Sequence, residues 1–183
     1  VGVMLFAQNR VHVSRQTVTP KMEDTVADST KPRMSSINGR MGMTVKGAAT
    51  SFKKGDTITL FVYADAPESM IDGYDAVIHY NPAQLTFDSV SSTLEEMDVH
   101  STDNELEPSS RELVITGIRS TKRKEPFTFN NTGLVEISFI AQQAGDALVD
   151  IIFEPGSATD SNIIDNKNQD ILNNADGITV TIR

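Results

Sequence analysis

Apolar and polar residues alternate along many short stretches of this chain. In residues 57–63, Ile58, Leu60 and Val62 share one side of the chain. This two-residue period is that of a β-strand with one buried face. The same period, or a short apolar run, predicts further strands at 41–46, 74–80, 85–90, 113–118, 134–141, 147–153 and 178–182. No segment has a helical period over ten or more residues, so the pattern predicts an all-β sandwich or barrel.

Two stretches between these strands lack the alternation, and we expect both to be loops. Residues 91–112 are rich in Asp and Glu, and residues 157–176 are rich in Asp, Asn and Ser. Asn and Asp favour turns because their side chains bond to the nearby backbone.

The N-terminal part differs from the rest, and we divide the chain into an arm, 1–40, and a sandwich, 41–183. Residues 8–38 are mostly polar and could not bury enough apolar area to order alone. Residues 1–7 are an apolar run, shorter than the roughly 20 residues of a membrane span. We expect this run to be the remnant of a leader or membrane anchor, or else a short strand.

The charge is unevenly distributed over the 183 residues, whose net charge is -9. Residues 1–55 carry nine Lys or Arg and three acidic residues. Residues 56–183 carry seven Lys or Arg and 22 acidic residues. An acidic protein repels nucleic acid and anionic lipid, so we expect neither as a partner. There is no cysteine, which excludes disulfides and thiolate chemistry.

Catalysis has no support in the sequence. The three histidines, His12, His79 and His100, are far apart, and no nucleophile elbow, zinc-protease or phosphate-binding motif is present. We therefore expect no enzyme and no organic cofactor. A carbohydrate-binding platform is also disfavoured, because the chain has no Trp and only three Tyr.

One loop is a weak candidate for calcium. Hard oxygen ligands suit Ca²⁺, and they are dense between residues 160 and 170. The spacing is not that of an EF-hand, and turn formation explains the same residues. The candidate ligands are Asp160, Asp165, Asn166, Asn168 and Asp170.

Protein association is better supported, because some strands are apolar on both faces. Val114 and Ile118 lie opposite the expected core side of residues 113–118, and Phe61 and Tyr63 opposite that of 57–63. Such residues are either covered by the chain itself or form an interface. A β-capable part of the arm is one candidate to cover them, as a strand donated by a neighbouring copy. The apolar residues of the arm that would form this contact are Val3, Leu5, Phe6, Val11 and Val13.

The order of several motifs resembles a cohesin domain. Gly55-Asp56 precedes one strand, Tyr80-Asn81-Pro82 with Leu85 and Phe87 follows the next, and Gly177 opens the last. The resemblance covers about residues 41–183. It implies a jelly-roll sandwich of about nine strands, which in many relatives binds dockerin modules and in others serves adhesive or structural roles at the cell surface.

Three functions follow as hypotheses. The first is an extracellular structural or adhesive subunit that assembles by protein contacts, through its arm, into a filament. The second is a membrane-tethered module that captures a separate protein ligand. The third is a carbohydrate-binding module.

Overall fold

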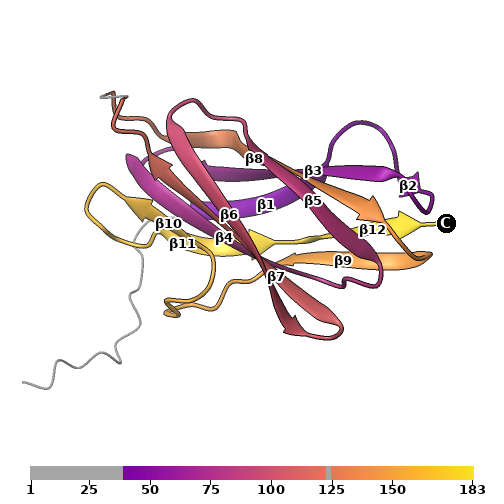
Figure 1. Ribbon diagram of the computed structural model, residues 1–183. Coiled ribbons are helices and arrows are strands. Elements are labelled where there is room, and N and C mark those ends of the chain that lie inside the picture. Colours follow the sequence, from indigo (N-terminus) through magenta and orange to yellow (C-terminus); the bar gives the residue numbers. More distant parts are fainter. Residues whose placement is uncertain (1–38, 123–124) are drawn as a thin grey trace, which may run out of the picture. The chain divides into compact units, whose positions relative to one another are not determined.

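The computed structural model describes residues 39–122 and 125–183, which form two packed β-sheets (Figure 1). One sheet, here sheet A, has the strand order β11-β1-β3-β8-β5, and the other, sheet B, has the order β2-β12-β9-β4-β7-β6 with β10 beside β4. The strands are β1 (Gly39–Val45), β2 (Ser51–Phe52), β3 (Thr57–Ala66), β4 (Ile71–Tyr80), β5 (Leu85–Ser92), β6 (Met97–Glu107), β7 (Ser110–Arg119), β8 (Phe129–Ala141), β9 (Gly145–Ile151), β10 (Asn162–Asp165), β11 (Leu172–Asp176) and β12 (Ile178–Ile182).

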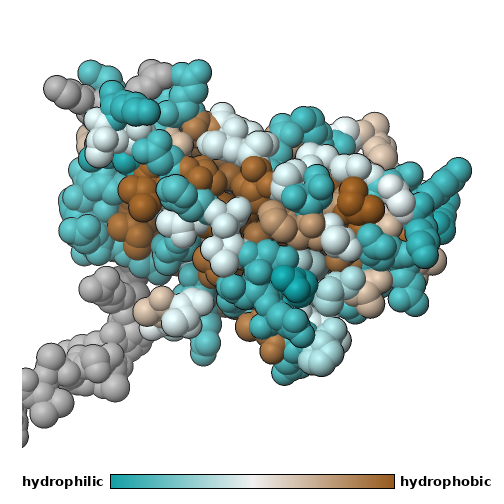
Figure 2. Space-filling model, in the orientation of Figure 1, coloured by the Kyte–Doolittle hydropathy of each residue, from teal (hydrophilic) through white to brown (hydrophobic). Residues whose placement is uncertain are grey.

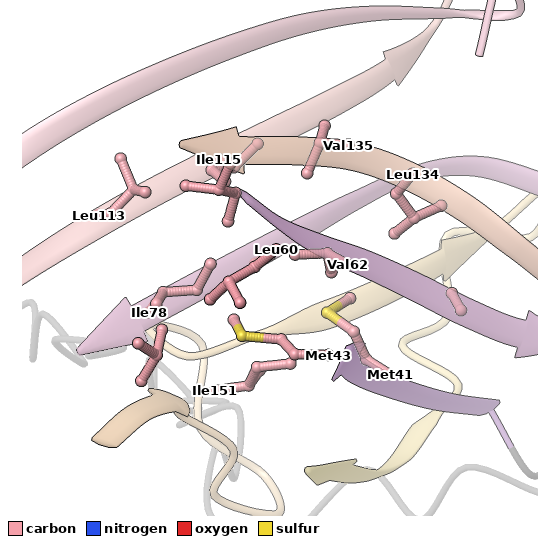
Figure 3. Close-up of a cluster of buried hydrophobic side chains, with 14 of the residues drawn as sticks. Met41, Met43, Leu60, Val62, Ile78, Leu113, Ile115, Leu134, Val135 and Ile151 are labelled. Atoms are coloured by element: carbon pink, nitrogen blue, oxygen red, sulfur yellow. The ribbon is translucent and has the colours of Figure 1, made fainter. Parts of the chain in front are cut away.

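The core lies between the two sheets and is built by the alternation seen in the sequence. Ile58, Leu60 and Val62 of β3 are fully buried, and Ile78 of β4 and Ile115 of β7 face them from sheet B (Figure 3). Burial of these side chains is the main favourable term in folding. The all-β jelly-roll sandwich expected from the sequence is therefore confirmed.

Side chains at the sandwich edges are less completely covered. Phe87 and Val90 of β5 and Val99 of β6 are only partly buried against the core. Apolar residues correspondingly appear among hydrophilic ones on the face displayed in Figure 2.

The expectation of a loop at 91–112 was wrong. β6 occupies Met97–Glu107 and pairs along its length with β7. Only Met97 of β6 is buried, because β6 is an edge strand whose two faces are largely exposed. Its polar sequence therefore lacks the apolar alternation that reveals a half-buried strand.

The second expected loop, 157–176, was also wrong in part. Two short strands lie in it, β10 beside β4 and β11 parallel to β1. Their core residues Ile163 and Leu172 each belong to a two-residue apolar pair within a polar sequence, which is too short to show a period.

Residues 1–38 of the predicted arm lie outside the described part of the chain. The interface candidates within them, Val3, Leu5, Phe6, Val11 and Val13, stay predictions. The boundary at residue 40 stays a prediction. Within the described residues, no helix is long and apolar enough to cross a membrane.

Candidate protein-binding surface

The outer face of sheet B is the most distinctive surface of the domain. We use the name B face for the outward-pointing side chains of four neighbouring strands of this sheet, β9, β4, β7 and β6. Strand registers place these side chains in rows, such as His79 beside Glu112 and Val77 beside Val114. Alternate residues of the same strands point into the core, so the pleat fixes which side chains face solvent.

The B face carries large apolar side chains in contact with solvent. Ile118 of β7 is 55% exposed and Leu148 of β9 is 54% exposed. Val114 and Ile152 are partly exposed on the same side of the sheet. Ile118 pairs with Gly73 at one end of β4, and Leu148 lies beyond the Tyr80–Val149 pair at the other end, with Val114 between them. The exposed apolar side chains are therefore spread along the face as separate contact points.

The charge of the B face has one sign. Its outward positions on β4, β6, β7 and β9 hold no Lys or Arg. They hold five carboxylates, which are Asp75, Asp98, Glu112, Asp146 and Asp150. Carboxylates concentrated on one face attract cationic groups and suppress binding of anionic ones.

Hydrogen bonds hold several polar groups of the B face in place. Thr116 Oγ1 donates to Asp75 Oδ1 at 2.6 Å, and Asn162 Nδ2 donates to Asp75 Oδ2 at 3.2 Å. His79 Nε2 lies 3.4 Å from Glu112 Oε2. These contacts order the surface before any partner arrives, which lowers the entropy cost of binding.

A cavity of about 330 Å³ adjoins the B face at the end of β4 and β9. Leu148 and Ile152 form its apolar side, and His79, Asp146 and Asp150 contribute polar groups. Its size suits one or two side chains of a docking element.

A polar cluster at the same end of the sandwich has a structural role. The Tyr80 hydroxyl donates to Asp103 Oδ1 at 2.9 Å, and Arg111 Nε donates to the same carboxylate. Burial and the Asp103 carboxylate raise the pKa of Tyr80 to about 12. The cluster connects β4 to the β6–β7 hairpin and gives the Tyr80 hydroxyl, the Asp103 carboxylate and the Arg111 guanidinium hydrogen-bond partners.

The calcium candidates serve the backbone in this structure. Asp165 Oδ1 accepts from the amides of Lys167 and Gln169, and Asp170 Oδ1 accepts from those of Ile163 and Leu172. Asp160 Oδ2 accepts from the Glu154 amide. Asn166 and Asn168 lie exposed in the turn. In the described part of the chain, no three His, Asp or Glu side chains are grouped as a metal site, and calcium binding stays a prediction.

The structure separates the aromatic residues predicted for an interface from the aliphatic ones. Val114 and Ile118 lie on the B face, whereas Phe61 and Tyr63 lie on the outer face of sheet A. Lys46 lies over the Phe61 ring at 5.4 Å, and the Tyr63 ring lies over Gly42. Both aromatics are half-buried by their own neighbours, so they do not extend the B face.

Sequence reasoning missed most polar members of the B face. His79 and His100 are distant in sequence but lie on the same face, in rows separated by the row of Val77, Val114 and Thr102. Their placement needs the pairing of β6 with β7, and β6 was expected to be a loop. Leu148 and Ile152 carried a signal, because both interrupt the polar side of an otherwise alternating strand.

The fold and this surface define an all-β sandwich module of protein–protein interaction. The family model that matches the sequence is the cohesin domain, over residues 41–182. The chain therefore belongs to the cohesin domain family. Domains of this family are non-catalytic interaction modules.

Several solved structures are similar to the chain in fold at low sequence identity. A type II cohesin domain from the cellulosome of Acetivibrio cellulolyticus is 10% identical with a TM-score of 0.60, over 78% of this chain and 95% of that one. A cohesin in a type I cohesin–dockerin complex from Clostridium thermocellum is 12% identical with a TM-score of 0.55, over 84% and 98%. A non-cellulosomal cohesin from the archaeon Archaeoglobus fulgidus is 11% identical with a TM-score of 0.52, over 80% and 91%. The comparison with curated proteins gave no match.

Proposed function

We propose that this cohesin domain is an extracellular or cell-surface module that captures a protein partner on its B face and has no catalytic activity. The observation that carries the proposal is that Ile118 and Leu148, two exposed apolar side chains near opposite ends of the B face, share this face with five carboxylates and no Lys or Arg. Apolar anchors supply binding energy when they are desolvated, and the surrounding charges select the partner.

The face indicates the chemistry of its partner. A docking element that spans the face, with one apolar side chain on Ile118, another on Leu148 and basic side chains near Glu112 and Asp150, satisfies both features. An acidic element would leave carboxylates facing carboxylates, which costs binding energy. The partner is therefore a basic protein segment with exposed apolar residues.

The solved relatives support a protein ligand without fixing its identity. One of them is a cohesin in complex with a dockerin, and another is described as non-cellulosomal. A dockerin-like module is one candidate partner, and it must have a basic docking face to suit the B face.

The test is a binding assay with matched variants. Wild type, Ile118→Asp with Leu148→Asp, and the control Phe61→Asp are immobilised and exposed to a panel of purified dockerin modules and to secreted proteins of the source organism. We expect the B-face variant to lose at least tenfold in affinity for the protein that wild type binds, and the control on the opposite sheet to retain it. Equal binding by both variants would refute the B face as the site.

The N-terminal arm favours a second candidate function, self-assembly. Residues 1–22 contain Arg10, Arg15 and Lys21 and no acidic residue, together with the apolar residues of 1–7. The arm is thus a basic segment with apolar residues, which is the kind of partner that the B face would bind. The arm of one copy would then occupy the B face of the next and build a filament, which makes the protein a structural or adhesive subunit.

Truncation separates the two candidates. Light scattering and negative-stain microscopy are applied to the full chain and to a chain that starts at Ser36. Polymers of the full chain and monomers of the truncated one support assembly through the arm. Monomers in both cases leave capture of a separate ligand, by a module that the arm tethers, as the function.

A further inference from the structure

The two edges of sheet B carry features of opposite charge that the proposed function does not use. At one edge, β6 ends just before its turn into β7 in residues 105–107, which we name the knob. Its register shifts between Glu105 and Glu107, so Leu106 is the extra residue of a β-bulge. A bulge redirects a side chain, and Leu106 is 46% exposed between two exposed glutamates.

The opposite edge has a cavity of about 500 Å³ with a mixed polar and apolar wall between β1, the turn that precedes β2, and β12. Val45, Phe52 and Ile178 are partly buried in its wall. β12 pairs with β2 only through Thr181 and Ile182. Among the described residues, the cavity edge of β12 before Thr181 thus has no strand partner. We name this cavity the socket.

The rim of the socket is basic at the end where β2 pairs with β12, and Asp176 lies near its other end, before Gly177 and Ile178. Lys53 and Lys54 follow Phe52 directly, and the Arg183 amide donates to the Phe52 carbonyl at 2.7 Å. All three side chains belong to exposed residues, and none forms an ion pair within the described part of the chain. The acidic residue in this turn is Asp56, whose carboxylate accepts from the Lys53 amide at 2.8 Å.

The knob and the socket lie on one row across sheet B. The registers connect Glu105 to Arg111, Arg111 to Tyr80, Tyr80 to Val149 and Val149 to Ile178. The row runs from β6, at one edge of the sheet, to β12, which is followed only by the two-residue β2 at the other edge (Figure 1). A second copy displaced along this row therefore brings its knob toward the socket of the first.

We propose that the socket receives the knob of a second copy of this chain. Leu106 packs against Phe52 and Ile178, and the flanking glutamates face the Lys and Arg side chains of the rim. The contact joins two different surfaces, so it is head-to-tail and leaves a free knob and a free socket at the ends. It is independent of what the B face binds.

The contact is expected to be weak. One hairpin tip buries less than the roughly 1,200–2,000 Å² of a stable protein interface. The charges on both sides are exposed, so salt screens their attraction. Self-association should therefore rise with protein concentration and fall as salt is added.

Sedimentation velocity of the full chain tests the proposal, from about 10 μM to about 1 mM protein and at low and high salt. We expect the weight-average mass of wild type to rise with concentration at low salt. Leu106→Ser, Glu105→Lys with Glu107→Lys, and Lys53→Glu with Lys54→Glu should each remain monomeric. The control Glu68→Lys with Glu125→Lys changes the charge equally at exposed sites elsewhere and should associate like wild type.

Charge exchange distinguishes this contact from assembly through the arm. An equimolar mixture of the reversed knob and reversed socket variants pairs each altered surface with its complement, so association should return. Wild type that stays monomeric at the highest concentration, variants that associate as wild type does, or a mixture that stays monomeric would each overturn the proposal.

Discussion

Glycine and tyrosine form a size-matched pair in the core. The ring of Tyr74 lies against Gly117 of the neighbouring strand, where an added Cβ would stand 2.1 Å from Tyr74 Cε1. Tyr74 also contacts Phe129 of sheet A edge to face, with ring centroids 6.2 Å apart. The small residue thus creates the space that the large one fills.

Gly117→Ala should destabilise the domain by about 1–3 kcal/mol, because the Tyr74 ring must move within a packed core. The control is Gly133→Ala, where the nearest atom, Thr93 Oγ1, is 3.5 Å from the added Cβ. Urea denaturation of both variants measures the difference. Equal stability of the two variants would show that the Tyr74 contact does not constrain position 117.

Tyr80 links the stability of the domain to alkaline pH. Its pKa is raised from 10.0 to about 12 by burial and by the Asp103 carboxylate. As pH rises above 10, the tyrosine ionises more readily in the unfolded chain than in the folded one. The stability that the raised pKa reflects is therefore complete below pH 10 and is lost as pH rises toward 12. Burial raises the pKa of Tyr74 in the same direction.

Tyr80→Phe should therefore lose less stability than wild type between about pH 9 and pH 11.5. At neutral pH the variant is less stable than wild type, because Asp103 loses one hydrogen bond. Urea midpoints measured across this range test the difference in slope. Parallel pH profiles would show that Tyr80 does not titrate with unfolding.

At the scale of elements, a buried serine closes a gap in sheet B. β9 and β10 share one edge of β4, and Val77 lies between their pairing regions. Ser161 Oγ accepts from the Val77 amide at 2.9 Å and donates to the Val77 carbonyl at 3.3 Å. The Val77 carbonyl also accepts from the Ile152 amide at 2.8 Å, so the serine replaces a strand partner at the Val77 amide.

Ser161→Ala should cost about 1–3 kcal/mol, because it leaves the buried Val77 amide without its acceptor. Denaturation measures the loss, with Ser109→Ala, in the exposed turn between β6 and β7, as the control. Hydrogen exchange at the Val77 amide should accelerate in the variant. Unchanged exchange at Val77 would mean that another acceptor takes the place of Ser161.

Strands with one buried face could be predicted from the sequence, and the others could not. β3 and β12 show a two-residue apolar period because their alternate side chains enter the core. β6 buries one residue, and β10 and β11 are short, so burial imposes no visible period on them. The signal follows burial, and it fades at the edges of the sheets.

At the scale of the molecule, the sequence indicated protein binding but not the surface that serves it. Alternation shows that Phe61 and Ile118 face away from the core, but it does not show which sheet each strand joins. The structure places them on opposite outer faces. Long-range pairing, which no local pattern encodes, therefore decides the composition of the site.

The whole-molecule charge pattern predicts how partner binding responds to salt. The B face has five carboxylates and no Lys or Arg among its outward positions. Affinity for a basic partner should fall as salt rises, through a slower association rate. Surface plasmon resonance at several salt concentrations measures both rate constants, and an association rate independent of salt would contradict the electrostatic role of this face.

The central claim, that partners dock on the B face, is tested most directly by site-specific photo-crosslinking. A benzophenone side chain is placed at Ile118 in one protein and at Phe61, on the opposite sheet, in another. Both are illuminated with the partner that wild type captures. The account predicts a crosslinked complex from position 118 and none from position 61. Crosslinking from position 61 alone would contradict it.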